Sequence, residues 1–105
     1  MVRTMASQSP NDPGLLVLVS LASGPRHGHA ILLDVEQFAG VRMGPGTLYG
    51  AISRLESESL IEPLAADGRR RPYRITDRGR SVLARRLRGL EQTVRTGLSR
   101  VAVES

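Results

Sequence analysis

The chemical group that dominates this 105-residue chain is the guanidinium of arginine. All 15 basic residues are Arg, and against 10 acidic residues they give a net charge of +5. Nine of these arginines lie within residues 69–88, where Asp77 is the one acidic residue. So dense a positive field favours a polyanionic partner, first of all duplex nucleic acid, although a solvated basic helix face shows the same charge run.

Two histidines, His27 and His29, have the side-chain type that binds metal ions or senses pH. Because they are two positions apart at the start of a helix, their rings do not converge, and no third ligand lies near them in sequence. We therefore expect no metal site and no cofactor. The pair fits a helix-start hydrogen bond, and a role in pH sensing stays open.

The residue types on which many enzymes depend are missing or scattered. The chain has no Cys, which excludes disulfides, thiolate nucleophiles and cysteine-based zinc sites. It has no Lys, which excludes a phosphate-binding loop of the Gly-Lys-Ser/Thr kind. No Ser-His-acid arrangement or carboxylate pair can be placed, so we expect a protein that is not an enzyme. Three aromatic residues, Phe38, Tyr49 and Tyr73, are too few for a base-stacking single-strand binder.

Apolar residues recur at helical spacing in four segments. Asp12 and Pro13 provide a cap and a first helical residue, and Thr76 provides a second cap. The pattern predicts helices over residues 13–22, 27–39, 45–59 and 77–103. The second helix has an apolar stripe of Ile31, Leu32, Val35 and Phe38 that is expected to face the core.

A β hairpin is expected between the third and fourth helices. Residues 60–64 and 71–75 each have the composition of a short strand, and Asp67-Gly68 between them is a strong turn signal. The tip of the hairpin then carries Arg69, Arg70 and Arg71. An arginine-tipped hairpin reaches phosphates or an adjacent minor groove.

The third helix has an inward stripe and an outward face of short polar residues. Leu48, Ile52 and Leu55 point inward, while Thr47, Tyr49, Gly50, Ser53 and Arg54 face out. Such an uncluttered helix face fits a major groove about 12 Å wide.

The last helix is longer than the rest of the domain can cover. Its apolar stripe has heptad-like spacing at Leu83, Leu87, Leu90 and Val94 and continues through Leu98. A long amphipathic helix of this kind calls for a partner, and a second copy of the chain is the simplest one.

These elements predict a mainly α fold with a two-stranded β hairpin: a winged helix-turn-helix followed by a long C-terminal helix. Residues 1–11 are expected to form a flexible N-terminal arm, residues 12–76 the DNA-binding domain, and residues 77–105 the dimerisation helix. A dimer of this kind meets a palindromic site with half-sites about 34–36 Å apart.

Several short motifs, in this order, resemble those of the PadR-like transcriptional regulators over roughly residues 14–90. The motifs are Gly24-Pro25-Arg26-His27-Gly28, Pro45-Gly46-Thr47-Leu48-Tyr49, Arg54-Leu55-Glu56, Leu60-Ile61, Arg71-Pro72-Tyr73-Arg74-Ile75-Thr76 and Gly79. The short C-terminal part is similar to that of the small subfamily, which has one long dimerisation helix. Members are mostly repressors that bind inverted repeats, often near their own promoters, and are released by small molecules such as phenolic acids or drugs.

The resemblance implies roles for matching residues. The recognition helix would use Pro45, Gly46, Thr47, Tyr49, Gly50, Ser53 and Arg54, and the wing would use Arg69, Arg70, Arg71 and Tyr73. From the apolar pattern of the first and last helices, the dimer interface is expected to contain Leu15, Leu18, Leu83, Leu87, Leu90, Val94 and Leu98. One departure from the family pattern is Ser59, which stands where Gly commonly ends the recognition helix in a left-handed conformation.

The expected function is a homodimeric, sequence-specific DNA-binding regulator. It would repress its own or a neighbouring promoter through a palindromic operator of double-stranded DNA, and release by a small-molecule effector stays open. The alternative is a winged-helix module that binds protein or RNA without reading a DNA sequence. No apolar run approaches the roughly 18–20 residues of a membrane span, so we expect a cytoplasmic protein without a membrane partner.

Overall fold

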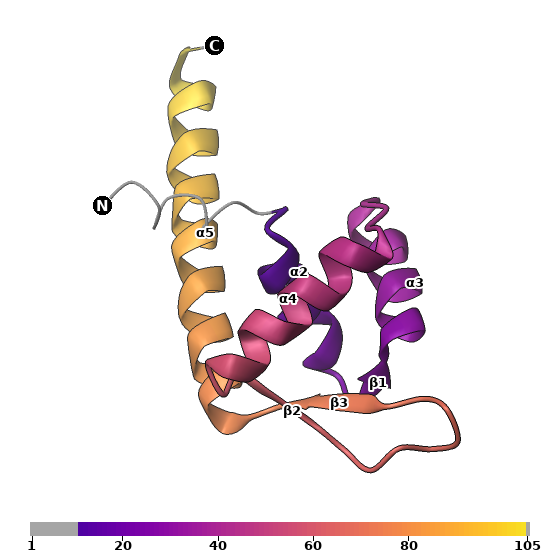
Figure 1. The fold of residues 1–105 in the computed structure, drawn as a ribbon. Helices are drawn as coiled ribbons and strands as arrows, with labels where there is room; N and C mark the ends of the chain where they lie inside the picture. Colours follow the sequence, from indigo (N-terminus) through magenta and orange to yellow (C-terminus); the bar gives the residue numbers. More distant parts are fainter. Residues whose placement is uncertain (1–10, 105) are drawn as a thin grey trace.

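A computed structural model describes residues 11–104 of the chain, so nearly all of the expected arm at residues 1–11 lies outside the described residues. The elements are α2 (Pro13–Leu21), β1 (Arg26–His27), α3 (Gly28–Ala39), α4 (Pro45–Ser57), β2 (Ile61–Pro63), β3 (Pro72–Ile75) and α5 (Asp77–Glu104). The arrangement is a winged helix-turn-helix with a long C-terminal helix, as predicted (Figure 1). Within the described region no helix combines the length and the apolarity needed to cross a membrane.

The small sheet has three strands, and the prediction of a two-stranded hairpin is therefore incomplete. β3 lies in the centre and pairs antiparallel with β2 on one side and with β1 on the other. In the additional pair, Arg26 lies opposite Tyr73 and His27 lies opposite Pro72. A strand of two residues has no periodicity to detect, and its partner follows more than 40 residues later.

Helix α2 occupies the middle of the protomer. It packs against α3, α4, α5 and β3, and Figure 1 shows it enclosed by the other helices. Its cap is the one predicted, since the Asp12 carboxylate accepts a hydrogen bond from the Leu15 N–H at 3.1 Å. The core is formed mainly by Leu16, Val17, Leu18, Leu21, Ile31, Val35, Leu48, Ile52, Leu55, Ile61 and Ile75.

Three residues expected at a dimer interface are buried inside the protomer instead. Leu15 and Leu18 on α2 and Leu83 on α5 are all part of the core. Because α2 packs against α3, α4, α5 and β3, these three side chains have little surface left for contact with a second copy.

Helix α3 buries less of its apolar stripe than the spacing predicts. Ile31 and Val35 are fully buried and Leu32 is partly buried, but Phe38 is exposed. Phe38 lies in the last turn of α3, where no neighbouring element covers the stripe, so its predicted place in the core is wrong. Gly40 ends the helix with φ 68°, the left-handed conformation that glycine adopts without strain.

Helix α4 ends in the left-handed turn that the family pattern predicts, even though the residue there is Ser. Ser59 has φ 62°. Its N–H donates to the Glu56 carbonyl at 3.0 Å, and the Leu60 N–H donates to the Leu55 carbonyl at 2.9 Å. This pair of hydrogen bonds is a Schellman motif, in which glycine is the preferred residue.

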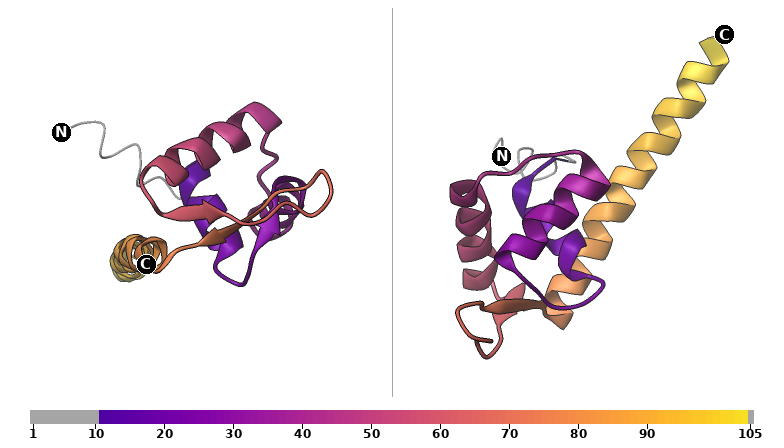
Figure 2. Two further views of the ribbon diagram at one scale, coloured as in Figure 1. Left: turned by 60° about the horizontal axis from the view of Figure 1, so that its bottom comes forward. Right: turned by 90° about the vertical axis from the view of Figure 1, so that its right-hand side faces the viewer.

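Helix α5 begins in contact with the turn at Ser59 and extends beyond the rest of the domain. The Thr76 hydroxyl accepts a hydrogen bond from the Gly79 N–H at 2.9 Å and donates to the Ser59 carbonyl at 2.7 Å, so Thr76 is the cap that was predicted. The C-terminal half of α5 projects away from the other elements (Figure 2). Apart from the half-buried Thr96, its side chains at residues 91–103 are exposed in the protomer.

Candidate nucleic-acid interface

The outward face of α4 has the character that the sequence predicts. Leu48, Ala51, Ile52 and Leu55 are buried, which leaves Thr47, Tyr49, Ser53 and Arg54 exposed. The helix begins at Pro45 after Gly44, whose position makes no side-chain capping hydrogen bond. A Cβ atom at Gly46 would meet nothing within 4 Å, and one at Gly50 would meet only the Arg54 guanidinium at 3.9 Å. The protomer itself therefore gives no steric reason for glycine at either position.

The hairpin tip places three arginines in solvent. Gly68 has φ 67°, and Asp67 and Arg70 exchange backbone hydrogen bonds of 2.7 and 3.1 Å across the turn. The Arg71 guanidinium donates to the Leu64 carbonyl at 3.1 Å, which ties the two sides of the hairpin together. Arg69 and Arg70 extend from the turn without such a tie to the backbone of the opposite side.

The arginines at residues 69–88 have different surroundings. Arg74 pairs with Glu62, and Arg86 lies 3.8 Å from the Asp12 carboxylate. Arg78 and Arg80 donate to the carbonyls of Glu58 and Ala22. In the part of the chain that the structure describes, by contrast, no carboxylate forms an ion pair with any of the three arginines at residues 69–71. The tip of the wing therefore presents three exposed guanidinium groups whose charge no carboxylate of the described residues offsets.

Tyr73 lies on β3 and not at the tip. Its ring is partly buried against the core. Burial raises the pKa of its phenol above the ordinary value, and the charge of Glu56 raises the pKa further, while Arg71 acts in the opposite direction. The phenol therefore stays protonated at neutral pH and is available as a hydrogen-bond donor.

His27 caps α3, as the sequence predicts, and it also reaches the wing. Its Nδ1 atom accepts a hydrogen bond from the Ala30 N–H at 3.4 Å. Its Nε2 atom lies 3.5 Å from the Arg70 guanidinium. This second contact joins residues 43 positions apart, and sequence reasoning missed it because only the β1–β3 pairing brings them together. Within the described residues, no group of three His, Cys, Asp or Glu could hold a metal ion.

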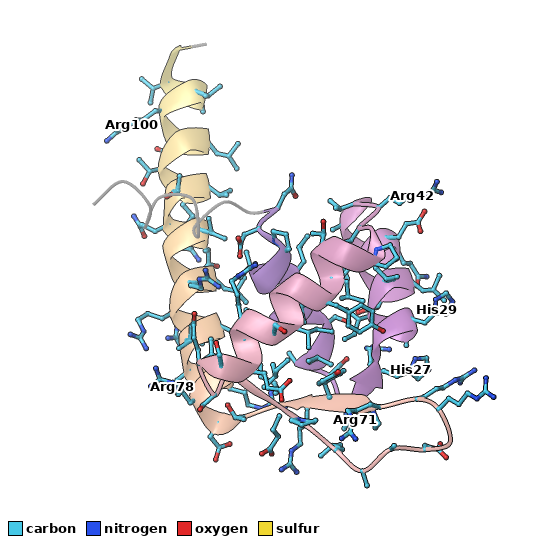
Figure 3. All side chains as sticks on the ribbon, in the orientation of Figure 1. His27, His29, Arg42, Arg71, Arg78 and Arg100 are labelled. Carbon is cyan, nitrogen blue, oxygen red and sulfur yellow. The ribbon has the colours of Figure 1, made fainter. Side chains whose placement is uncertain are left out.

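A cavity of about 300 Å³ separates the start of α3 from the wing. Its lining comes from three elements that the sequence keeps apart: His27, Gly28, His29, Tyr49, Arg69, Arg70 and Arg71. Figure 3 shows His27 and His29 on the same side of the molecule as Arg71 and the wing. Gly28 allows the close approach of Tyr49, since a Cβ atom there would lie 2.3 Å from the Tyr49 hydroxyl. The face formed by α4 and the wing is thus rich in donors and positive charge.

A helix-turn-helix with an exposed polar third helix and a basic wing defines the class of winged-helix DNA-binding proteins. The model of the family described as "Transcriptional regulator PadR-like family" matches residues 17–85. The chain belongs to this family of DNA-binding transcriptional regulators, whose members are not enzymes.

Two curated relatives match most of this chain. The chain is 38% identical over 84 residues to Transcriptional regulator Rv3488 of Mycobacterium tuberculosis, covering 77% of this chain and 78% of that protein. It is 52% identical over 75 residues to an uncharacterized 37.1 kDa protein in transposon TN4556 of Streptomyces fradiae. That match covers 71% of this chain but 22% of the transposon protein, so the chain spans less than a quarter of that relative.

Solved structures share the fold. A transcriptional regulator from Clostridium thermocellum superposes with a TM-score of 0.72 at 25% identity, covering 79% of this chain and 86% of that one. A PadR family transcription regulator from Clostridium difficile gives a TM-score of 0.69 at 22% identity, covering 82% of this chain and 97% of that one.

Proposed function

We propose that this protein is a homodimeric, sequence-specific regulator that represses its own or a neighbouring promoter by binding an inverted repeat. One observation carries the proposal: the exposed polar face of α4 lies beside a wing whose three tip arginines have no carboxylate partner among the described residues. The first surface fits a major groove and the second fits the phosphate backbone beside it. The site of action would be cytoplasmic DNA.

In this proposal different residues of the interface contact different parts of the DNA. Thr47 and Tyr49 contact phosphates and the groove edge, while Ser53 and Arg54 reach base edges. Pro45, Gly46 and Gly50 let the backbone of α4 approach the DNA closely, which is supported by the open space beside both glycines. The wing contributes Arg69, Arg70 and Arg71, with Tyr73 as a donor at its base.

The exposed stripe of α5 supports the homodimer. Leu87, Val94 and Leu98 are 40%, 57% and 66% exposed in the protomer. These side chains follow one face of the helix together with the half-buried Leu90, and a second copy would bury them. The proposed interface therefore contains Leu87, Leu90, Val94 and Leu98.

A second cavity supports control by a small molecule. It has a volume of about 300 Å³ and lies between α2 and α5. Leu15, Val82 and Leu90 give it an apolar wall, and Arg85 gives it positive charge beside the Arg86–Asp12 ion pair. An amphipathic anion would suit this lining, and because the cavity adjoins the exposed stripe of α5, its occupancy could change how two copies meet.

The test is a gel-shift titration with duplex DNA from the region upstream of the protein's own gene, at two salt concentrations. Unlabelled specific duplex should displace the probe, and a scrambled duplex of equal length and composition should not. Equal displacement by both competitors, with a steep salt dependence, would favour the alternative of a protein- or RNA-binding module.

A further inference from the structure

A neutral His27 ring cannot accept hydrogen bonds from both the Ala30 N–H and the Arg70 guanidinium. A neutral ring carries one proton, so one nitrogen accepts and the other donates. The Nδ1 atom accepts from the Ala30 N–H and satisfies a backbone donor in the first turn of α3. With Nδ1 as the acceptor from Ala30, a neutral ring carries its proton on Nε2, and His27 then presents an N–H to the cavity.

The Arg70 guanidinium faces this same nitrogen. Its Nη1 lies 3.5 Å from His27 Nε2, and a guanidinium donates but never accepts. Two donors at this distance do not bond to each other, but they converge on any acceptor placed between them. An acceptor with several negatively charged oxygens would bond to both.

The surroundings of this donor pair also select for an anion. The cavity of about 300 Å³ that the pair faces is lined by Arg69, Arg71, His29 and Tyr49 as well. It contains no carboxylate in its lining. The first turn of α3, at Gly28 and His29, borders it and contributes the positive end of the helix dipole.

We propose that His27 and Arg70 form a phosphate clamp that grips one backbone phosphate of DNA between the start of α3 and the wing. His27 Nε2–H and the Arg70 guanidinium donate to the same phosphate, while His27 Nδ1 keeps its bond to Ala30. The clamp fixes the position of the wing relative to α3. It thereby determines the orientation of the domain on the duplex. This proposal rests on the proposed function, because the phosphate belongs to the DNA that α4 reads.

The decisive variant is His27→Ser, because serine retains the N-cap hydrogen bond but cannot reach the clamp. Affinity for a random-sequence duplex should fall about tenfold in the full chain, since a hydrogen bond to a charged group is lost. The slope of log affinity against log salt should stay unchanged, since a neutral donor displaces no counterion. Arg70→Ala should also weaken binding about tenfold but reduce the slope by about one.

The double variant tests whether the two residues hold one phosphate. If they do, the combined loss should be clearly smaller than the product of the two single losses, because each single variant already loosens the shared phosphate. Arg100→Ala is the matched control, since Arg100 lies on the far part of α5, remote from the wing (Figure 3). Its affinity and its salt slope should equal those of the wild type.

Nitrogen-15 NMR of the His27 ring provides an independent reading. The ring should show the Nε2–H tautomer in the free protein and in the duplex complex, and its Nε2 signal should move when duplex is added. Inorganic phosphate tests whether the site binds a free anion or a phosphate of the DNA backbone. Free phosphate should shift the Nε2 signal only weakly. At a concentration equal to that of the DNA phosphates, it should not prevent duplex binding.

The results separate this proposal from the proposed function. If the wild type binds no duplex, the proposed function fails. If it binds duplex while His27→Ser binds equally well, or if His27 shows the Nδ1–H tautomer in the complex, the clamp is refuted and the proposed function stands. Tight saturation by inorganic phosphate with unchanged duplex affinity in His27→Ser would also refute it, in favour of a site for a free phosphate.

Discussion

At the scale of single residues, the turn after α4 combines a backbone conformation that suits glycine with a side chain that does not. Ser59 has φ 62°, held by hydrogen bonds on both sides of it. For a residue with a Cβ atom this conformation costs on the order of 1 kcal/mol. The strain is tolerated because the turn delivers Leu60 to the core, where it is buried.

Ser59→Gly should therefore stabilise the protein by about 1 kcal/mol, measured by urea denaturation. Ser57→Gly is the matched control, because Ser57 is helical and glycine there should cost roughly 0.5 kcal/mol. Equal effects of the two substitutions would show that the left-handed turn carries no strain.

Gly79 illustrates the opposite case, in which glycine is required by space. A Cβ atom at Gly79 would lie 2.1 Å from the Leu60 carbonyl oxygen and 2.8 Å from Ile75 Cγ1. The first of these neighbours is backbone, so the start of α5 would have to move away from β2 and β3.

Gly79→Ala should destabilise the fold by roughly 1–3 kcal/mol in thermal or denaturant unfolding. Gly97 lies on the same helix, and a Cβ atom there would meet nothing within 4 Å. Gly97→Ala should instead be neutral or stabilising by up to about 1 kcal/mol. A neutral Gly79→Ala variant would contradict the close packing of α5 on the sheet.

At the scale of elements, α4 and the wing are expected to contribute to DNA binding in different ways. In the proposed complex, Arg69 at the wing tip faces the charged DNA backbone, which every duplex presents, whereas the outward residues of α4 face base edges. Affinity and sequence preference should therefore separate between the two elements.

Arg69→Ala in the wing should weaken binding to all duplexes alike and reduce the salt slope by about one. The measurement is a salt series by fluorescence anisotropy with the operator and with a random duplex. A loss confined to the operator would place Arg69 on bases and not on phosphate.

Ser53→Ala or Arg54→Ala on α4 should instead change which sequence is preferred. Each base contact removed should cost about 1–3 kcal/mol on the preferred duplex and less on the others. Selection from a random-duplex library with each variant measures this directly. An unaltered preference together with a uniform loss of affinity would mean that these residues contact only the backbone.

At the scale of the whole molecule, α5 connects the DNA-binding domain to the proposed second copy. Its first half packs against α2 and β3 through residues such as Leu83, whereas Leu98 and its neighbours are exposed. In the proposed dimer, the first half of α5 belongs to the protomer core and its second half forms the contact with the other copy. The distance between the two DNA-binding domains then depends on this helix.

Leu98→Glu should yield a folded monomer, because Leu98 is 66% exposed and contributes little to the protomer core. Light scattering should show the monomer mass, circular dichroism should show native helix content, and affinity for the inverted repeat should fall sharply. Gln92→Glu adds the same charge to α5 away from the stripe and should leave the dimer intact. Binding of the inverted repeat by monomeric Leu98→Glu at wild-type affinity would contradict the dimer proposal.

The sequence by itself determined the features that depend on near neighbours. The caps at Asp12 and Thr76, the four helices and the Asp67-Gly68 turn follow from local propensity and from apolar spacing, and the structure confirms them. The motifs and their order were enough to identify the family, since both are read directly from the amino-acid sequence.

Only the tertiary structure decided which apolar residues are buried in the protomer and which stay exposed on its surface. Leu18 and Leu98 are both leucines on apolar helix faces, yet one is buried and the other exposed, because burial depends on which elements pack nearby. The tertiary structure also added β1 to the sheet and brought His27 against Arg70. Periodicity reports contacts a few residues apart, whereas these pairings join segments more than 40 residues apart and exist only once the chain has folded.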